Sequence, residues 1–266
     1  ILLRAFDFRW YLASLGAVIW AFSSYFFIII GANGFIGSSL VKKMIANSVE
    51  VIAIDITFVG DRLPDSTLVT KIESSVDPSL ADKIPSGEYD AFYNLAWKGV
   101  NGTDKASPAV QLGNIQIAVD CADICKKFRV KKYLCAGTVA ENATFSLSKL
   151  EKTSGGMMYG VAKYACRLIV EDYCKNIGQQ FVWMQFSNIF GEGNKTGNLV
   201  SYTLGELIAG NEPTFGPALQ PYDFIYVDDV VAVFLCVLEN LDKFEPGDLS
   251  VLEVGTGIRV SIRYVV

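Results

Sequence analysis

The feature that most constrains the fold is an uncharged apolar run that enters a glycine-rich turn. The run Phe26-Phe27-Ile28-Ile29-Ile30 has the length and the β-branched content of a buried strand. Gly31-x-x-Gly34-x-x-Gly37 follows, and then a helical apolar pattern over residues 38–46. The first glycine permits a tight turn, the second lets backbone N–H groups approach an anion, and the third lets the helix pack closely on the strand. This order is typical of a site where a dinucleotide pyrophosphate meets a helix N-terminus.

An aspartate after the next predicted strand, residues 49–54, indicates which dinucleotide is bound. Asp55 lies 24 residues after Gly31, near the spacing of about 20 at which a carboxylate accepts the ribose hydroxyls of NAD. The same carboxylate would repel the 2′-phosphate of NADP, so we expect NAD. The predicted cofactor-binding residues here are Gly31, Asn33, Gly34, Phe35, Ile36, Gly37 and Asp55. The alternatives are a tight strand–helix connection without a ligand and a solvated aspartate.

Strands and helices alternate along the following residues, which is typical of an α/β protein with a parallel sheet. Between residues 56 and 86 the chain is polar and turn-rich, and no strand or helix is predicted there. A strand over residues 89–96 brings Leu95 and the small Ala96 to the cofactor, where the nicotinamide ribose would pass. The later predicted elements are a helix over 109–129, a strand over 131–137, a helix over 156–176 and a strand over 181–186.

The last third of the chain has the irregular character of a lobe that closes over a substrate. Glycine- and asparagine-rich residues 191–197 and proline-containing residues 213–221 flank a predicted helix over 199–209. A strand, a helix and a strand over residues 224–254 return to the main sheet. We therefore expect a Rossmann-type doubly wound parallel sheet over residues 25–187 and a small substrate-binding lobe over residues 188–266, with a truncated C-terminus.

Residues 1–24 form an atypical apolar N-terminal extension. Residues 10–24 are uncharged, whereas Arg4, Asp7 and Arg9 precede them. Because residues 25–30 are needed as the first strand, the apolar run is shorter than the roughly 20 residues that span a bilayer. We rank a non-native or packed extension first, an interfacial helix second and a membrane span third, and a signal peptide is a further alternative. A cytoplasmic protein without a membrane partner is expected.

Composition excludes several classes of site. The net charge is −5 and the chain has no histidine, which argues against a nucleic-acid surface and removes histidine from catalysis and metal binding. The six cysteines are Cys121, Cys125, Cys135, Cys166, Cys174 and Cys236, and none forms a zinc-like pair. We expect buried thiols in a reducing compartment and no metal site.

A tyrosine and a lysine one helical turn apart carry the predicted chemistry. Tyr159 and Lys163 lie four residues apart, so on a helix they share a face. A fixed ammonium and a positive nicotinamide ring would favour the phenolate and make Tyr159 a base near neutrality. Lys163 would also hold the ribose hydroxyls of the cofactor. The alternative is a chance pair on a helix surface.

The ordered motifs together resemble the extended short-chain dehydrogenase/reductase family, the NAD-dependent nucleotide-sugar epimerases and dehydratases. The resemblance covers roughly residues 26–265. The matching residues are Gly31-x-x-Gly34-x-x-Gly37, Asp55, Asn94-Leu95-Ala96, Gly137-Thr138, Tyr159-x-x-x-Lys163, Ser187-Asn188-Ile189-Phe190-Gly191 and Asp223-Phe224-Ile225-Tyr226-Val227-Asp228-Asp229.

The resemblance implies a triad and a substrate site. Thr138 would hydrogen-bond the reacting sugar oxygen beside Tyr159 and Lys163, Asn188 would contact the substrate, and Asn114 would lie near the site. Asp228 and Asp229 are similar to residues that cap and pack a helix. Homodimerisation through two helices of each subunit is typical of the family, and the helices over 109–127 and 156–176 are the candidates.

Departures from the family pattern narrow the reaction. Dehydratases usually carry an acidic residue one or two places after the triad hydroxyl, where this chain has Val139 and Ala140. Glu141 comes one place later and would point differently on an extended segment, so dehydration is disfavoured. Asn142 replaces the family's usual tyrosine.

Two arginines of the family pattern are also replaced, which bears on the nucleotide. Tyr222 stands where an arginine usually grips the diphosphate, and Gln185 where another arginine is frequent. Lys195 or Arg259 would have to substitute, and Lys195 is taken as a substrate-binding residue.

Three functions remain open from the sequence. The first is an NAD-dependent nucleotide-sugar epimerase that works by transient oxidation, and the second is a 4-ketoreductase of a nucleotide-deoxysugar that consumes reduced cofactor. The third is a non-catalytic dinucleotide-binding regulatory protein, against which Tyr159, Lys163 and Thr138 count.

Overall fold

The computed structural model describes residues 25–60, 62–240 and 251–265, and the expectations for residues 1–24 lie outside this range. Within it, no helix combines the length and the apolar composition that crossing a membrane requires. The strands are β1 (Phe26–Ile30), β2 (Glu50–Asp55), β3 (Val69–Glu73), β4 (Ala91–Asn94), β5 (Lys132–Thr138), β6 (Gln180–Phe186), β7 (Asn188–Phe190), β8 (Pro221–Tyr226), β9 (Val251–Val254) and β10 (Arg259–Ser261). The α-helices are α2 (Phe35–Ala46), α3 (Leu80–Lys83), α4 (Pro108–Phe128), α5 (Met157–Ile177), α6 (Leu199–Ile208), α7 (Val227–Asn240) and α8 (Ile262–Val265), and η2 (Thr103–Ala106) and η3 (Val139–Lys149) are 3-10 helices.

A seven-stranded parallel sheet organises the molecule, in the order β3-β2-β1-β4-β5-β6-β9. The chain moves outward from β1 to β3 and then crosses back to β4, so the order reverses beside β1. Ile28 and Ile29 on β1 are fully buried, as expected for a central parallel strand whose two faces are both covered. The predicted doubly wound α/β sheet is therefore confirmed.

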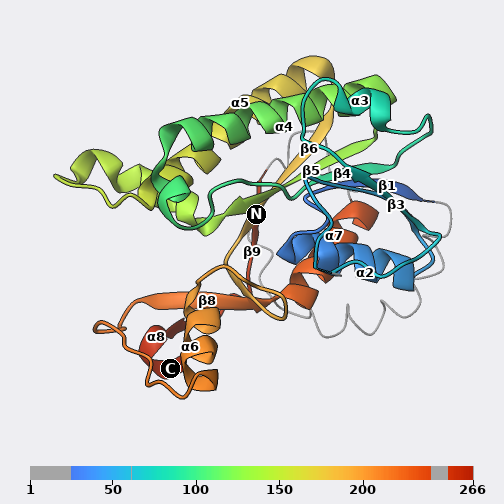
Figure 1. Cartoon of the computed structure of the whole chain (residues 1–266). Helices are drawn as coiled ribbons and strands as arrows, with labels where there is room; N and C mark the ends of the chain where they lie inside the picture. Colours follow the sequence, from blue (N-terminus) through green and yellow to red (C-terminus); the bar gives the residue numbers. More distant parts are fainter. Residues whose placement is uncertain (1–24, 61, 241–250, 266) are drawn as a thin grey trace.

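Helices cover both faces of this sheet (Figure 1). α2 and α7 pack on one face and α3, α4 and α5 on the other, each over its own apolar cluster. The second cluster contains five free, buried thiols, which confirms the predicted burial for Cys121, Cys125, Cys135, Cys166 and Cys174. Among the described residues, no group of three or more His, Cys, Asp or Glu side chains is placed to hold a metal ion.

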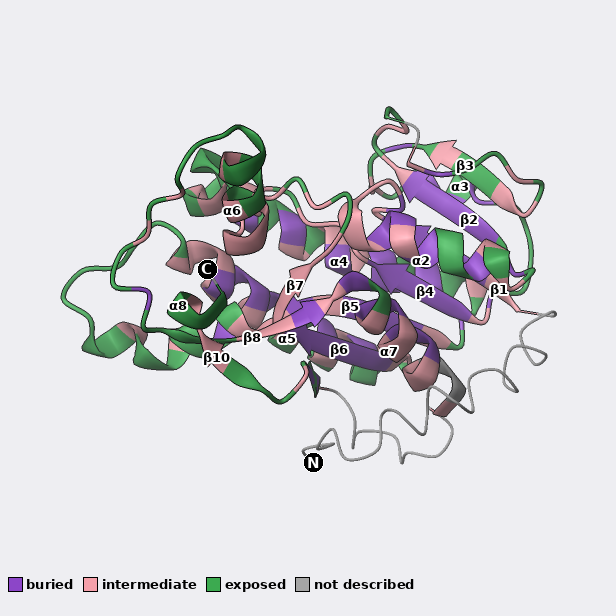
Figure 2. Ribbon diagram, turned by 90° about the horizontal axis from the view of Figure 1, so that it is seen from below, coloured by how far each residue is buried: buried purple, intermediate pink, exposed green. Residues whose placement is uncertain are grey.

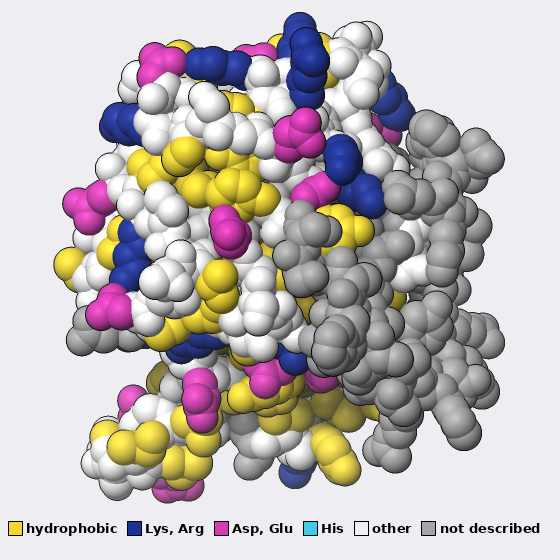
Figure 3. Space-filling model, turned by 90° about the vertical axis from the view of Figure 1, so that its right-hand side faces the viewer, with side chains coloured by type: hydrophobic (Ala, Val, Ile, Leu, Met, Phe, Trp, Pro, Cys, Tyr) yellow, Lys and Arg dark blue, Asp and Glu magenta, His cyan; other side chains and the backbone are white. Residues whose placement is uncertain are grey.

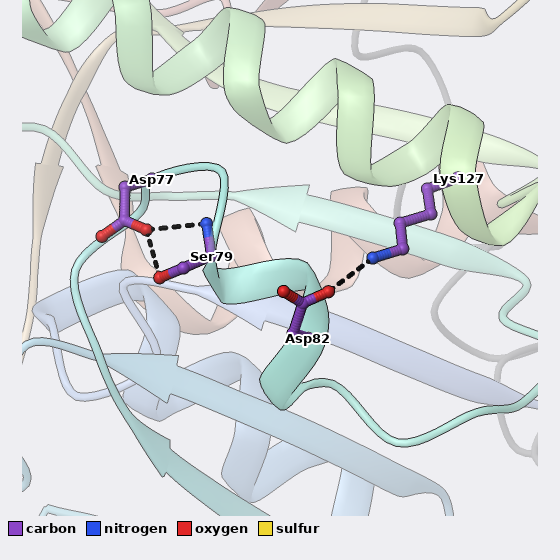
Figure 4. A network of polar contacts seen from close by, with 4 residues as sticks. All are labelled: Asp77, Ser79, Asp82 and Lys127. Carbon is purple, nitrogen blue, oxygen red and sulfur yellow. Dashed lines mark hydrogen bonds and ion pairs between the residues drawn. The ribbon is translucent and has the colours of Figure 1, made fainter.

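The prediction of a structureless stretch between residues 56 and 86 is wrong. β3 is an edge strand with the polar sequence VTKIE and no fully buried residue, so it lacks the apolar pattern that identified the other strands. The short α3 follows, and Asp77 before it accepts a hydrogen bond from the backbone N–H of Ser79 at 2.8 Å (Figure 4). In the same view Lys127 at the end of α4 pairs with Asp82 of α3 at 2.9 Å, a surface contact between the two helices.

A smaller three-stranded sheet, in the order β10-β8-β7, forms the lobe with α6 and α8. The prediction that the strand starting at residue 224 returns to the main sheet is therefore wrong, whereas the strand over residues 251–254 does return to it as β9. β7 pairs with β8 in parallel and β10 pairs with β8 antiparallel. The lobe helices carry no buried residue (Figure 2). Ser187 connects β6 of the large sheet to β7 of the small one, and its N–H donates to the carbonyl oxygen of Val254 at the end of β9, at 2.9 Å.

Charged side chains of both signs are interspersed on the face drawn in Figure 3. On the face drawn in Figure 3, Lys and Arg alternate with Asp and Glu and form no continuous basic area. This face therefore does not supply the clustered cations that neutralise nucleic-acid phosphates.

Candidate active site

Three glycines bring β1, the turn and α2 closer than side chains would allow. Gly31 has φ of +77°, and a Cβ there would lie 2.8 Å from the amide nitrogen of Ala96. A Cβ at Gly37 would lie 2.1 Å from the carbonyl oxygen of Gly31, so α2 packs directly on the turn. Gly34 is the N-cap of α2 and supplies no side-chain cap. The first N–H groups of a helix have no partner within it, so this backbone cradle fits a pyrophosphate.

Asp55 lies beside this cradle because β2 pairs with β1. Its carboxylate accepts hydrogen bonds from the N–H groups of Asn33 and Ile56, each at 2.8 Å. The Asn33 side-chain amide donates to the carbonyl oxygens of Thr57 and Val59, whereas its Oδ1 is buried without a partner among the described residues. These hydrogen bonds fix the end of β2 to the glycine turn. The Asp55 carboxylate oxygens can still accept further hydrogen bonds from a ribose.

A cavity of about 240 Å³ opens beside Asn33. Its other lining residues are Phe58, Leu63, Pro64, Asp65 and Lys71, all from the stretch in which the sequence predicted no element. The apolar Phe58 and Leu63 suit the adenine of a dinucleotide whose ribose reaches Asp55. The chain's own residues therefore fit NAD, from the glycine turn to this cavity.

Tyr159, Lys163 and Thr138 converge at the carboxyl end of β5, the edge of the sheet that also holds the glycine turn. The Thr138 hydroxyl lies close enough to that of Tyr159 to favour the phenolate form of the tyrosine. Lys163 is 5% exposed, and its Nζ donates to the carbonyl oxygen of Ala136 at 2.6 Å. The three residues predicted to be catalytic thus lie together in the fold.

Burial is the main cause of the pKa shifts of Tyr159 and Lys163. It raises the pKa of Tyr159 to about 12, while the nearby Thr138 hydroxyl opposes this shift and the Glu141 charge adds to it. Burial also lowers the pKa of Lys163 to about 8, against the raising influence of Cys166, Cys135 and Glu141. In the chain alone the Tyr159 pKa is therefore not lowered, because desolvation of the phenolate dominates and Lys163 is not among the groups that shift it. The lowering expected beside a bound nicotinamide stays a prediction.

Trp97 is a site residue that sequence reasoning missed. The Lys163 Nζ lies 3.8 Å from the centroid of the Trp97 ring. Asn114 of α4 holds the adjacent backbone, because its side chain bonds both the N–H and the carbonyl oxygen of Lys98 at 2.8 Å. The sequence held one signal for Trp97: it directly follows Ala96, and the segment around Ala96 borders the glycine turn.

Glu141 does not lie on an extended segment, and that expectation is corrected. The chain turns at Thr138 into η3, where Glu141 and Thr138 form a capping box. Glu141 is fully buried and accepts from the Thr138 N–H at 2.8 Å, the Trp183 indole at 3.0 Å and the Gln185 amide at 3.2 Å. Gln185 is thus a partner of Glu141 inside the protein.

A second cavity, of about 490 Å³, lies at the lobe. Asn188 lines it and donates its amide to the carbonyl oxygen of Asp223 at 3.2 Å. Tyr222 also lines the cavity, whereas Lys195 and Arg259 are exposed and do not. The structure thus brings Asn188 to the cavity and leaves Lys195 outside its lining. Asp228 and Asp229 lie in the first turn of α7, where their charge is favourable at a helix N-terminus; the predicted capping role stays a prediction.

Comparisons with known proteins agree with this geometry. Residues 27–255 match the family model described as the NAD dependent epimerase/dehydratase family. A putative UDP-glucose 4-epimerase of Methanocaldococcus jannaschii is 22% identical over 246 residues, which cover 88% of this chain and 78% of that protein.

Two solved structures are similar in fold. UDP-N-acetylglucosamine 4-epimerase from Methanobrevibacter ruminantium aligns with a TM-score of 0.74 and 22% identity, over 91% of this chain and 79% of that one. The Bordetella bronchiseptica enzyme WbmF, solved with NAD⁺, aligns with a TM-score of 0.75 and 22% identity, over 92% and 77%. With the match to the family model over most of its length, the chain belongs to the NAD-dependent epimerase/dehydratase family, a family of enzymes with NAD as cofactor.

Proposed function

We propose that the protein is a nucleotide-sugar epimerase that works by transient oxidation of a sugar hydroxyl. The observation that carries this proposal is the placement of Tyr159 and Lys163 one turn apart on α5, with the Thr138 hydroxyl beside Tyr159. Such a pair can receive a substrate hydroxyl and take its proton. The names of two similar proteins, UDP-glucose 4-epimerase and UDP-N-acetylglucosamine 4-epimerase, support a sugar nucleotide as substrate.

Each residue of the site has a distinct task in this proposal. Tyr159 accepts the proton of the substrate hydroxyl and later returns it, and Thr138 holds the substrate oxygen by its own hydroxyl. Lys163 places a positive charge beside Tyr159 and holds the ribose of the cofactor, while Asp55 and the glycine turn fix its adenosine and pyrophosphate. Bound NAD⁺ would supply the hydride acceptor for the oxidation, and inversion would require the keto sugar to turn so that the hydride returns to its opposite face.

A tyrosine pair on one helix tests this assignment. Tyr159→Phe removes the proton acceptor and should lower kcat by a factor of about 10² to 10⁴ while NAD still binds. Tyr164→Phe is the matched control, because Tyr164 contacts Phe145 instead of Thr138, and its turnover should stay at the wild-type level. UDP-glucose and UDP-N-acetylglucosamine are the first substrates to assay. Full activity of Tyr159→Phe would contradict the proposal.

Thr138 offers a second, graded comparison. Its Oγ1 also accepts the N–H of Ala140 at 3.2 Å, so Thr138→Val loses a helix cap along with the contact to Tyr159. Thr138→Ser keeps both hydroxyl contacts and should retain most of the turnover. Equal activity of the two variants would remove Thr138 from the reaction.

Reduction of a 4-keto sugar nucleotide is the second candidate. A Tyr159 pKa of about 12 leaves the phenol protonated near neutrality, which suits proton donation to a carbonyl. The two reactions differ in cofactor use. NAD retained through purification and released on denaturation supports the epimerase, whereas stoichiometric oxidation of added NADH supports the reductase.

We further propose that two copies associate through α4 and α5. These helices pack side by side over one face of the sheet (Figure 1). They expose Leu112, Leu168 and Ile169 by 65%, 46% and 48%, and apolar side chains of this size favour an interface. Light scattering of the protein and of Ile169→Lys tests the contact: the wild type should be dimeric and the variant monomeric.

A further inference from the structure

Trp97 contacts both side chains on which the proposed reaction depends. Its ring face lies against the Lys163 ammonium, with Nζ 3.8 Å from the ring centroid. Its ring also meets the ring of Tyr159 edge to face, at 6.1 Å between centroids and 87° between planes. We propose that Trp97 is a positioning residue, whose π face holds the Lys163 ammonium at the end of β5 and whose ring fixes the orientation of Tyr159. This inference rests on the proposed function, because it concerns the same tyrosine and lysine.

The indole is itself fixed by α4. Its Nε1–H donates to Oε1 of Gln111 at 2.9 Å. Gln111 is 1% exposed, and its amide nitrogen donates to the carbonyl oxygens of Gly99 and Asp104 at 2.9 and 3.1 Å. The side chain of Asn114 clamps the Lys98 backbone on the next residue. A ring anchored by its N–H and by its neighbouring backbone can hold other side chains in place.

The buried charge of the Lys163 ammonium is stabilised by few groups besides the Trp97 ring. Among the described residues, no carboxylate lies within ion-pair distance of Lys163. Its Nζ donates to the Ala136 carbonyl oxygen at 2.6 Å, and the second indole, that of Trp183, is farther away at 5.5 Å. A desolvated ammonium over an indole face gains more than an exposed one. The ring face therefore compensates part of the cost of burying the charge.

The titratable groups around this pair come from several elements. Tyr159 and Cys166 lie on α5 with Lys163, Cys135 on β5 and Glu141 in η3. Lys105 of η2 lies over the Tyr159 ring, 5.3 Å from its centroid. All of these groups are unchanged in a Trp97 variant. A comparison between two Trp97 variants therefore measures the effect of the aromatic ring alone.

The decisive comparison is between Trp97→Phe and Trp97→Leu. Both lose the Gln111 hydrogen bond and are similar in volume, but only phenylalanine keeps a π face. The Lys163 titration is followed by NMR of protein labelled at lysine Cε, without cofactor, and its signal is assigned with Lys163→Met. We expect the Lys163 pKa to be lower in Trp97→Leu than in Trp97→Phe by about half a unit to one unit. Equal pKa values in the two variants overturn the proposal.

Turnover gives the second readout. kcat should fall several-fold further in Trp97→Leu than in Trp97→Phe, and the basic limb of the pH profile should move to lower pH by the same amount as the Lys163 pKa. KM for the sugar nucleotide should match between the two, since a merely structural role would change kcat and KM together. If Trp97→Leu does not fold, Trp97→Met provides the same comparison. The titration does not require an active enzyme. A wild type without sugar-nucleotide activity would therefore contradict the proposed function, and the titration would still decide the inference on Trp97.

Discussion

The carboxylate of Asp55 and the backbone N–H of Asn33 meet at 2.8 Å, which joins the end of β2 to the glycine turn after β1. A second N–H, that of Ile56, binds the other carboxylate oxygen at 2.8 Å. The side chain is therefore held in place before any ligand arrives, with its negative charge at the predicted ribose position.

Asp55→Asn should weaken NAD binding and relax discrimination against NADP. The variant loses charge-assisted hydrogen bonds worth about 1.5 to 3 kcal/mol each, so the NAD dissociation constant should rise by a factor of about 10 to 100. The repulsion of a 2′-phosphate disappears with the charge. Calorimetric titration with both cofactors measures the ratio, and an unchanged preference would assign Asp55 a purely structural role.

Gly37→Ala should disturb the glycine turn itself. The added Cβ would lie 2.1 Å from the Gly31 carbonyl oxygen and 2.9 Å from the Ala32 Cα, both backbone atoms, so α2 must move. We expect a loss of about 2 kcal/mol or more in the free energy of unfolding, together with loss of NAD binding. Gly205→Ala in α6 is the matched control, because no atom lies within 4 Å of its Cβ position. It should be neutral or stabilise by up to about 1 kcal/mol, as urea denaturation can show.

Glu141→Gln should destabilise the protein and lower the Tyr159 pKa. The amide nitrogen of the new side chain would face N–H donors that now point at a carboxylate, from Thr138, Trp183 and Gln185. The cost in unfolding free energy should be about 2 to 4 kcal/mol. Because the Glu141 charge raises the Tyr159 pKa, ultraviolet titration against Tyr159→Phe should detect phenolate at lower pH. Glu171→Gln, which removes a helix-surface pair with Lys175, should change stability by no more than about 0.5 kcal/mol.

Lys163 should make stability rise with pH above neutrality. Its pKa is lowered to about 8 in the folded protein, whereas an unfolded lysine titrates near 10.4. Between these values the unfolded chain binds more protons, so the free energy of unfolding increases with pH, and the contribution is lost as pH falls through 8. The full span is at most about 3 kcal/mol.

Lys163→Met removes this dependence. The stability of the variant relative to the wild type should be highest near pH 7 and should decline as pH approaches 10.5. Urea denaturation of both proteins across this range gives the difference, in which the other titrating groups cancel. A constant difference would mean that Lys163 keeps an ordinary pKa in the fold.

The parts of the fold that the sequence predicted are those that local pattern determines. The apolar run of β1, the glycine spacing and the four-residue interval between Tyr159 and Lys163 all report on neighbours along the chain. β3 was missed because a polar edge strand has no apolar periodicity. The inward turn of Glu141 was missed because its partners Trp183 and Gln185 lie more than 40 residues away.

The electrostatics of the site depended on distant contacts in the same way. The spacing of Tyr159 and Lys163 suggested that the ammonium would lower the tyrosine pKa. In the fold that ammonium is held by Ala136 and Trp97, and desolvation acts on both groups. Neither the anchoring of Trp97 by Gln111 nor the depth of Lys163 can be read from residue spacing.

The five thiols between the sheet and the helices α4 and α5 act as internal reporters of how this layer opens. Each is buried, with 2% exposure or less, and a thiol reagent reaches such a group only after local or global unfolding. If α4 and α5 separate from the sheet as a unit, all five sites become reactive at one rate, and that rate measures the free energy of opening. Stepwise fraying would instead modify them one after another. The natural cysteines thus allow the cooperativity of this half of the fold to be measured without an introduced label.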